Sequence, residues 1–298
     1  MKIFVTGSTG YIGSELVGIL ANAGHQVTGL VHSPEKEESL VSLGATPLKG
    51  DLEGVVSWKD QAAENEAVIH LGFASKGDPA AIDKHVVETL LPALKAKGRS
   101  KSFIYTSGVW VLGDTHGKPE DESGSTDKAF AMVAWRPAVE QMVLNASAPG
   151  FSTAVIRPGL VYGGKAGILA MLWGAALKEG VVTYVGEGQN HWPLIHREDL
   201  AQLYRMVAEK LGTGIFHGVD GLAVKVLDVA KTVSLAAGKG GAVKSLPLEE
   251  AKKTMGLFAE ALTLDQVVVG KRSAELGWKC AYPSLAFAAP KAFQEFTT

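Results

Sequence analysis

Short apolar and β-branched runs alternate with longer amphipathic stretches through the first half of the chain. A strand that is covered on both faces is a continuous apolar run, whereas a helix repeats its apolar positions about every 3.6 residues. The pattern predicts strands at residues 2–6, 26–31, 46–49, 67–71, 102–106 and 152–157. It predicts helices at residues 11–23, 34–43, 58–63, 80–96 and 128–146. This alternation indicates an α/β fold, a Rossmann-type doubly wound parallel sheet with helices on both faces.

The regular alternation fails after Arg157, where a helix at 167–177, a strand at 182–185, a helix at 197–211 and a strand at 214–219 follow in mixed order. We therefore expect a dinucleotide-binding Rossmann domain at residues 1–160, completed by parts of the 190–220 segment. Residues 161–298 are expected to form mainly a smaller, mixed substrate-binding lobe. The apolar helix at 167–177 is well short of the roughly 20 residues that a membrane span requires, so we expect no membrane insertion.

Composition narrows the class of partner. The 298 residues carry 29 Lys plus Arg against 31 Asp plus Glu, a formal net charge of −2, which shows no basic footprint for nucleic acid or an anionic membrane. A small-molecule substrate fits better. The single cysteine, Cys280, excludes an internal disulfide framework, and Met1 leads into an apolar strand without a basic leader, so we expect a cytoplasmic protein.

A glycine-rich turn follows the first predicted strand in the sequence IFVTGSTGYIGSELVGIL. Glycine lets the backbone approach a diphosphate closely, and the N-terminus of the next helix offers N–H donors to it. We therefore expect an NAD(P)-class dinucleotide to contact Gly7, Thr9, Gly10, Tyr11, Ile12 and Gly13. A tight turn without a ligand is the alternative, but the alternating strands and helices that follow favour the binding site.

The end of the second strand discriminates between NAD and NADP, because a carboxylate there accepts the ribose hydroxyls and repels a 2′-phosphate. The chain has Val31, His32 and Ser33 at this point and no carboxylate. His32, Ser33 and also Lys36 could contact a phosphate, so NADP is favoured over NAD. The alternative for His32 is an exposed loop histidine without a partner.

Six segments resemble, in order, motifs of the short-chain dehydrogenase/reductase superfamily in its extended or atypical form, which includes NAD-dependent epimerases and dehydratases. They are TGSTGYIG (6–13), GDL (50–52), HLGFAS (70–75), YTSG (105–108), RPGLVYG (157–163) and WPLIHREDLA (192–201). The resemblance implies an NAD(P)-dependent oxidoreductase. It implies further cofactor contacts at Asp51, Leu52, Leu71, Gly72, Phe73, Thr106, Pro158 and Val161.

One motif of that superfamily is absent: no tyrosine of this chain is followed four residues later by a lysine. The family places this pair on the helix after the fifth strand, with a glutamate four residues further on. Counting back from Glu140 puts Arg136 at the lysine position and Met132 at the tyrosine position. Met132 has no proton to give, whereas Arg136 stays charged and can hold ribose hydroxyls. We therefore expect a non-standard active site in which Arg136 also contacts the cofactor.

The catalytic residues that we expect are Ser107, Arg136 and Tyr162. Tyr162 would lie beside the nicotinamide as a proton donor, or else have a packing role. Ser107 matches the family's active-site serine, but a register set by residues 111–113 puts Gly108 there, and the hydroxyl would then cap the strand end. His191 or an ordered water are the other proton sources.

The resemblance places Trp110, Met132, His191 and Trp192 on the substrate side, which indicates a partly aromatic pocket. A loop tryptophan and a solvent-exposed histidine are the alternative. His191 and His196 are five residues apart without a carboxylate or thiol cluster beside them, so we expect no metal site.

These observations favour an NADP-dependent reductase or dehydrogenase that acts on a carbonyl or alcohol of a small, fairly apolar molecule. One alternative is a catalytically degenerate sensor or regulator that binds the dinucleotide. Another is an epimerase or lyase that uses the nicotinamide transiently. The resemblance also makes a homodimer an option, paired through the helices at 80–96 and 128–146.

Overall fold

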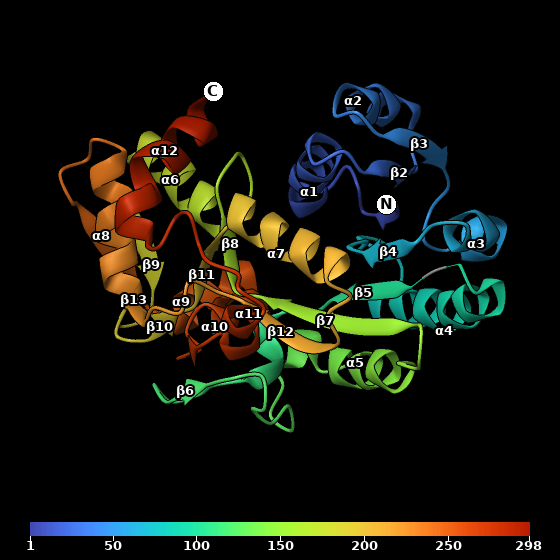
Figure 1. The fold of residues 1–298 in the computed structure, drawn as a ribbon. Helices are drawn as coiled ribbons and strands as arrows, with labels where there is room; N and C mark the ends of the chain where they lie inside the picture. Colours follow the sequence, from blue (N-terminus) through green and yellow to red (C-terminus); the bar gives the residue numbers. More distant parts are fainter. Residues whose placement is uncertain (100) are drawn as a thin grey trace. The chain divides into compact units, whose positions relative to one another are not determined.

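The computed structural model describes residues 1–99 and 101–298, and its main feature is a seven-stranded sheet (Figure 1). The strand order is β12-β7-β5-β4-β1-β2-β3, and the pairs from β3 to β7 are parallel. The strands are β1 (Lys2–Thr6), β2 (Gln26–Val31), β3 (Thr46–Lys49), β4 (Ala67–His70), β5 (Ser102–Thr106), β7 (Ser152–Pro158) and β12 (Gly214–Gly218). The Rossmann-type α/β fold and the six strands of the first half are confirmed, with two ends shifted by one residue.

The helices that accompany this sheet cover both of its faces, α4 and α5 on one and α1 and α7 on the other (Figure 1). They are α1 (Tyr11–Asn22), the 3₁₀ turn η1 (Pro34–Lys36), α2 (Glu37–Ser42), α3 (Val55–Ala63), α4 (Pro79–Lys97), α5 (Arg136–Asn145) and α7 (Arg197–Glu209). The apolar faces of α3, α4 and α5 pack against the sheet in one core that includes Trp58, Leu90 and Val143. Burial of these side chains drives the layering.

The helix predicted at 128–146 is wrong in its first half. Residues 131–133 form the 3₁₀ turn η3 (Ala131–Val133), and α5 begins only at Arg136. Pro137 lies in the first turn of α5, where its missing N–H needs no partner. A proline inside a helix removes one main-chain hydrogen bond and so favours a helix start just before it, although α4 and α12 do continue through Pro92 and Pro290.

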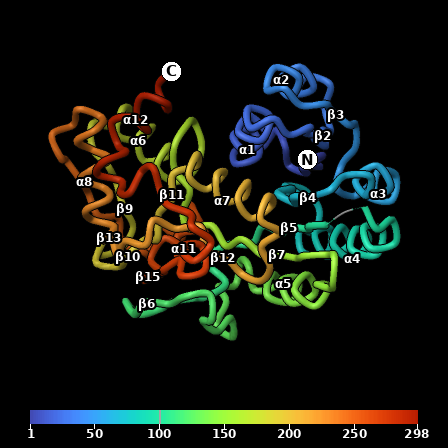
Figure 2. The backbone as a smooth tube through the Cα atoms, in the orientation of Figure 1, coloured from blue at the N-terminus to red at the C-terminus, as the bar shows by residue number. Residues whose placement is uncertain are grey.

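The chain divides into two compact units, and each unit is made of several separate segments. The first unit comprises Met1–Ser107, Trp135–Arg157 and Ala201–Phe216, and the second comprises Gly108–Ala134, Pro158–Leu200 and His217–Thr298. Figure 2 follows the backbone, which enters and leaves each unit several times. Residues 108–134 precede residue 160 but belong to the second unit, because they contact segments of that unit that are distant in the sequence.

The second unit is built from short elements around its own core. Its strands form two-stranded pairs: β6 (Pro119–Glu120) with β15 (Val267–Val268), β8 (Leu160–Tyr162) with β11 (Leu194–His196), β9 (Val182–Val185) with β14 (Val243–Leu246), and β10 (His191–Trp192) with β13 (Val224–Lys225). Its other elements are η2 (Val109–Leu112), α6 (Ile168–Glu179), α8 (Val226–Ala236), α9 (Leu248–Met255), α10 (Leu257–Ala261), α11 (Lys271–Glu275) and α12 (Leu285–Thr297). Tyr162, Trp173 and Trp192 are among the side chains of this core.

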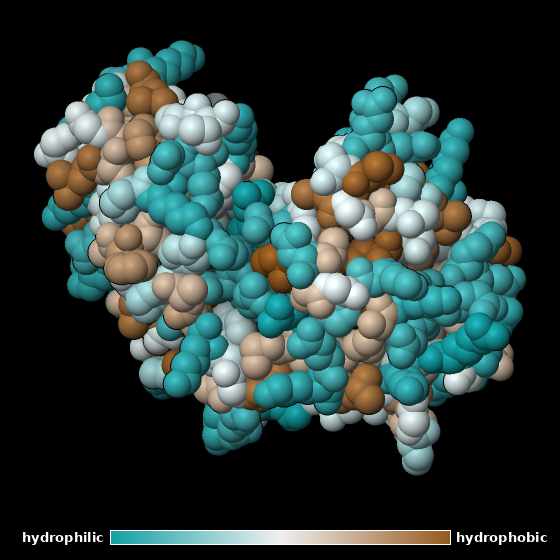
Figure 3. Space-filling view, turned by 45° about the horizontal axis from the view of Figure 1, so that its top comes forward, coloured by the Kyte–Doolittle hydropathy of each residue, from teal (hydrophilic) through white to brown (hydrophobic). Residues whose placement is uncertain are grey.

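The surface carries no extended apolar area on the side drawn in Figure 3, where hydrophilic side chains dominate and the hydrophobic ones form separate patches. Within the described residues, every helix is too short or too polar to cross a bilayer.

Candidate functional site

The glycine-rich turn joins β1 to α1 in a tightly packed geometry. Gly7 has a φ of +66°, a left-handed conformation that favours glycine, and its carbonyl accepts the Gly10 N–H at 2.9 Å. A Cβ on Gly7 would lie 2.7 Å from the main-chain carbon of Leu71, and a Cβ on Gly13 would overlap the Gly7 carbonyl. Helix α1 begins directly afterwards, at Tyr11, so its N-terminal N–H groups face the space above the turn.

A cavity of about 680 Å³ opens beside this turn, within the first unit. It lies where β1, β2, β3 and β4 end, at the point in the sheet where the strand order changes direction. This crevice is where open α/β sheets hold nucleotides. The lining residues that the sequence predicted are Gly7, Thr9, Gly10, Tyr11, Ile12, Gly13, His32, Asp51, Leu52, Leu71, Gly72 and Phe73.

The cavity has a basic rather than an acidic border after β2. His32 and Lys36 line it, whereas Ser33 does not and instead hydrogen-bonds the Glu35 carboxylate. The predicted adenine contact, Asp51, lines the cavity, but its Oδ1 also accepts the Gly54 N–H at 2.7 Å, which holds the turn before α3. A 2′-phosphate would therefore meet two basic side chains at this border.

Sequence reasoning missed Leu30, Glu53 and Lys76, which also line the cavity. Glu53 directly follows the GDL segment, and Lys76 directly follows HLGFAS, so extending each motif by one residue would have found both.

Arg136 lies outside the residues that line the cavity, but its side chain reaches toward them within the first unit. Its Nη1 donates to the Thr106 carbonyl at 2.7 Å and to the Tyr105 hydroxyl at 3.1 Å. Its guanidinium carbon lies 6.0 Å from the ring centroid of Phe73, which lines the cavity, and 4.5 Å from that of Trp135. The guanidinium is therefore fixed at the carboxyl end of β5, one strand beyond the cavity.

Two other predicted residues lie at the same end of β5. The Thr106 hydroxyl bonds with the Tyr204 hydroxyl at 2.7 Å rather than opening into the cavity. The Ser107 hydroxyl is buried and has no hydrogen-bond partner among the described residues, although the Ser107 N–H donates to the Ile156 carbonyl at 2.8 Å. A buried hydroxyl without a partner costs free energy, and Ser107 does not line the cavity.

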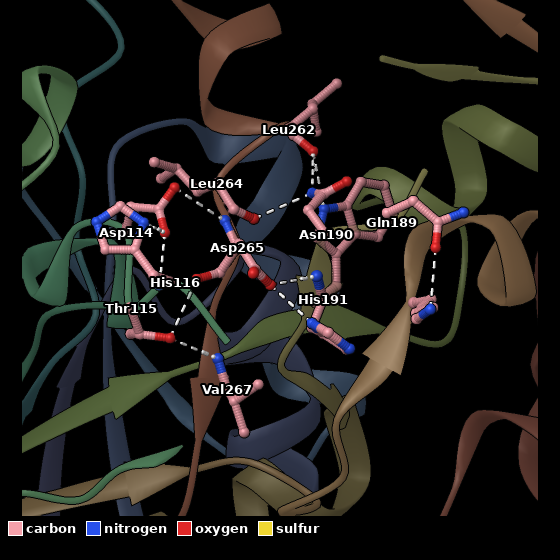
Figure 4. Close-up of polar contacts among 12 residues, drawn as sticks. Asp114, Thr115, His116, Gln189, Asn190, His191, Leu262, Leu264, Asp265 and Val267 are labelled. Carbon is pink, nitrogen blue, oxygen red and sulfur yellow. Dashed lines mark hydrogen bonds and ion pairs between the residues drawn. The ribbon is translucent and has the colours of Figure 1, made fainter. Parts of the chain in front are cut away.

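The remaining predicted residues belong to the second unit. His191 is clamped there by Asp265, whose Oδ1 accepts the His191 N–H at 2.9 Å and lies 2.7 Å from its Nδ1 (Figure 4). Trp192 is buried and donates from Nε1 to the Leu262 carbonyl, which indicates a packing role. Trp110 packs edge-on against Phe130 and Phe258.

Pro158 ends β7, and Val161 pairs with Ile195 in the small sheet of β8 and β11. Tyr162 is fully buried, and its hydroxyl has no partner. Burial raises the pKa of Tyr162 well above its usual value, and the nearby Asp220 and Asp199 raise it further. The structure thus favours the packing alternative for this side chain over proton transfer.

Met132 is 43% exposed in the turn η3, and Arg136 is the first residue of α5. The helix predicted at 128–146 would contain both residues, but in the structure they lie in different elements, because α5 begins only at Arg136.

Comparisons with known proteins identify the family. The family model of the NAD dependent epimerase/dehydratase family matches residues 3–216, and the chain belongs to this family. It is 32% identical to an uncharacterized protein of Saccharomyces cerevisiae, YLL056C, over 94% of each chain. It is 27% identical to 4-hydroxy-2-methyl-3-oxo-4-farnesyl-3,4-dihydroquinoline-1-oxide ketoreductase of Stigmatella aurantiaca, over 85% of this chain and 78% of that one.

Among solved structures, the fold is similar to that of human epimerase family protein SDR39U1 with NADPH, with a TM-score of 0.79 and 22% identity over 99% of each chain. Membership of the family establishes an extended or atypical short-chain dehydrogenase/reductase, a class of NAD(P)-dependent oxidoreductases and epimerases.

Proposed function

We propose that this protein is an NADPH-dependent oxidoreductase that reduces a carbonyl group of a small, fairly apolar molecule, or oxidises the corresponding alcohol. One observation carries the proposal. The first unit holds a cavity of about 680 Å³ with a glycine turn on one side and His32 and Lys36 at the end of β2. The ketoreductase relative from Stigmatella aurantiaca supports the carbonyl chemistry.

The donor groups around the cavity suit a dinucleotide with a 2′-phosphate. The turn from Gly7 to Gly13 and the first turn of α1 would bind the diphosphate through main-chain N–H groups. His32 and Lys36 would bind the 2′-phosphate, and no carboxylate directly after β2 repels it. Arg136, at the β5 end, would donate to the ribose next to the nicotinamide and supply positive potential there.

When bound, NADPH supplies a hydride for the carbonyl carbon, and the protein must supply a proton for the oxygen. The Ser107 hydroxyl would donate to that oxygen or hold the carboxamide. Within the second unit, His191 has the arrangement of a general acid, because Asp265 accepts from Nδ1 and leaves Nε2 to exchange a proton. Tyr162 is the other residue that the sequence suggests for this role.

The proposal is tested first by binding. We expect NADPH to bind at least tenfold more tightly than NADH in fluorescence titrations. The Lys36→Ala variant should lower the ratio of NADPH affinity to NADH affinity at least twofold, because it removes a charge from the 2′-phosphate position. Lys84→Ala is the matched control, since Lys84 is exposed on α4 and does not line the cavity.

Turnover is tested with NADPH and a panel of aldehydes and ketones. NADPH oxidation that depends on one class of carbonyl compound would establish the reductase. Tight NADPH binding without turnover across the panel would favour a sensor or regulator. Conversion of a sugar nucleotide without net NADPH consumption would favour an epimerase, and absence of binding by either dinucleotide would refute the proposal.

A further inference from the structure

A buried chain of polar side chains runs beneath the carboxyl ends of β1, β4 and β5 in the first unit. We call it the Asp83 chain; it consists of Thr6, His70, Asp83, Tyr105 and Arg136. Asp83 lies at its centre, where Oδ1 is 3.1 Å from His70 Nε2 and Oδ2 accepts the Tyr105 hydroxyl at 2.7 Å. Asp83 is 5% exposed, and His70 and Tyr105 are almost completely buried.

The position of Asp83 makes a carboxylate unexpected on packing grounds. It lies on the face of α4 that also carries Val86, Val87 and Leu90, all of which are fully buried. Burial of a charge costs several kcal/mol unless donors surround it, so an apolar side chain would suit this face better for stability alone. The sequence carries a signal of this unusual carboxylate, because a charged residue at position i is followed by apolar residues at i+3, i+4 and i+7 on the same helix face.

The donors on both sides of Asp83 point toward it. Because Asp83 accepts from Nε2, a neutral His70 accepts at Nδ1 from the Thr6 hydroxyl, 2.6 Å away, and Thr6 Oγ1 also accepts the Gly72 N–H at 3.1 Å. His70 then carries its proton on Nε2, facing Asp83. On the other side, Arg136 donates to the Tyr105 hydroxyl, which donates to Asp83. One carboxylate therefore fixes the direction of every hydrogen bond in the chain.

Both ends of the Asp83 chain reach the cavity border. Gly72 lines the cavity, and the Arg136 guanidinium lies over Phe73, which also lines it. An arginine side chain has many rotamers, and holding it in one before a ligand arrives removes an entropic cost from binding. The Asp83 chain supplies that constraint from the interior.

We propose that Asp83 is a positioning residue for the nicotinamide half of the dinucleotide, holding Arg136 through the Tyr105 hydroxyl and the main chain at Gly72 through His70 and Thr6. This inference rests on the proposed dinucleotide site. It assigns a role in that site to a side chain that contacts neither the cavity nor Arg136 directly.

The test compares two ligands by isothermal titration calorimetry. NADPH contains the nicotinamide half, whereas adenosine 2′,5′-bisphosphate ends at the adenosine side. The variants are Asp83→Asn, Tyr105→Phe and Arg136→Ala, with Ser152→Ala as control. Ser152 is also buried in the first unit and its hydroxyl donates to the Lys101 carbonyl at 2.9 Å, but it is the first residue of β7 and lies outside the Asp83 chain.

We expect Asp83→Asn and Tyr105→Phe each to weaken NADPH binding five- to tenfold while adenosine 2′,5′-bisphosphate affinity stays within twofold. Ser152→Ala should change neither affinity by more than twofold. Because Asp83 acts partly through Arg136, Asp83→Asn should weaken NADPH binding by a smaller factor when added to Arg136→Ala than it does in the wild-type protein. A general loosening of the fold would instead weaken both ligands and add fully in the double variant.

Equal losses for both ligands, full additivity, or unchanged NADPH affinity would each overturn the inference while leaving the proposed function intact. If the wild-type protein binds neither dinucleotide, the proposed function itself fails. Circular dichroism establishes that each variant is folded. Should Asp83→Asn not fold, Tyr105→Phe decides the question, because it removes the same connection with little change of volume.

Discussion

Two buried polar clusters, one in each compact unit, differ in how their polar atoms are satisfied. In the Asp83 chain of the first unit, two donors converge on one buried carboxylate. In the second unit, the Tyr162 hydroxyl and the Oδ2 atom of Asp220 are buried without a hydrogen-bond partner. Burial raises the pKa of the Asp220 carboxyl to about 7, against the opposing effect of the Leu222 N–H.

The comparison teaches that burial of a carboxyl group has opposite consequences in the two places. Donors that converge on a carboxylate make its removal costly, because they would be left without an acceptor. A buried carboxyl oxygen without a donor is destabilising in its charged form, so its removal costs little or even stabilises the fold. The Asp83 chain therefore holds its side chains in one geometry, whereas the charged Asp220 carboxyl lowers the stability of the fold at high pH.

The largest difference is expected between two tyrosine variants of the same chemistry. Tyr105→Phe removes a hydroxyl that bonds to both Asp83 and Arg136, and it should lower the free energy of unfolding by about 2 kcal/mol. Tyr162→Phe removes a hydroxyl without a partner, and it should change that free energy by less than about 0.5 kcal/mol. Urea denaturation measures both.

Equal destabilisation by the two variants would break the comparison. The same proteins also test catalysis: a tenfold loss of carbonyl reduction in Tyr162→Phe with unchanged stability would support Tyr162 as the proton donor.

A smaller, pH-dependent effect is expected for Asp220→Asn. The folded carboxyl, with its pKa near 7, binds a proton more tightly than the unfolded one, so wild-type stability falls as the pH rises from about 4 to about 7. Asparagine does not titrate. The variant should therefore gain stability relative to wild type over this interval, on the order of 2 kcal/mol because the residue is only partly buried.

Denaturant unfolding of the variant and the wild-type protein at pH 4.5, 6 and 8 measures this gain in the free energy of unfolding. Asp228→Asn, an exposed aspartate of the same unit, is the control and should leave the wild-type slope unchanged. A parallel shift of Asp220→Asn at all three pH values would contradict the assignment of the slope to Asp220.

A smaller effect on stability than that of Asp220→Asn is expected for Asp265→Asn. The His191 and Asp265 side chains are 21% and 29% exposed, so their pairing should contribute only about 0.5–1 kcal/mol. Carbonyl reduction should nevertheless fall at least tenfold if His191 donates the proton, because asparagine no longer stabilises the charged imidazole. Glu209→Gln removes another His–carboxylate pair, with His25 in the first unit, and should leave activity unchanged.

Much of the first unit could be predicted from the sequence because its signals are local. Each buried strand is a short apolar run, and the glycine turn lies between the first strand and the first helix, where few alternatives exist. The glycine turn and the end of the second strand identified seven of the cavity-lining residues, and the family resemblance identified five more. Pro137 was an equally local signal, but the helix prediction across residues 128–146 passed over it.

The second unit and the buried clusters could not be predicted in the same way. Asp265 is 74 residues from His191, and their pairing depends on how β10 and the segment before β15 are brought together. Asp83 was invisible as a positioning residue because its partners His70 and Tyr105 come from two different strands. A sequence pattern reports which faces are apolar, and it does not report which polar atoms meet across elements.

The sequence by itself determined the order of strands and helices, the phosphate-binding turn and the basic border after β2, since backbone preference and hydrophobic periodicity act over a few residues. The tertiary structure alone decided which polar side chains have partners, that Asp83 holds Arg136 through Tyr105, and that Tyr162 is enclosed. Those outcomes depend on burial and on distances of a few ångströms between segments far apart in the chain, which packing sets.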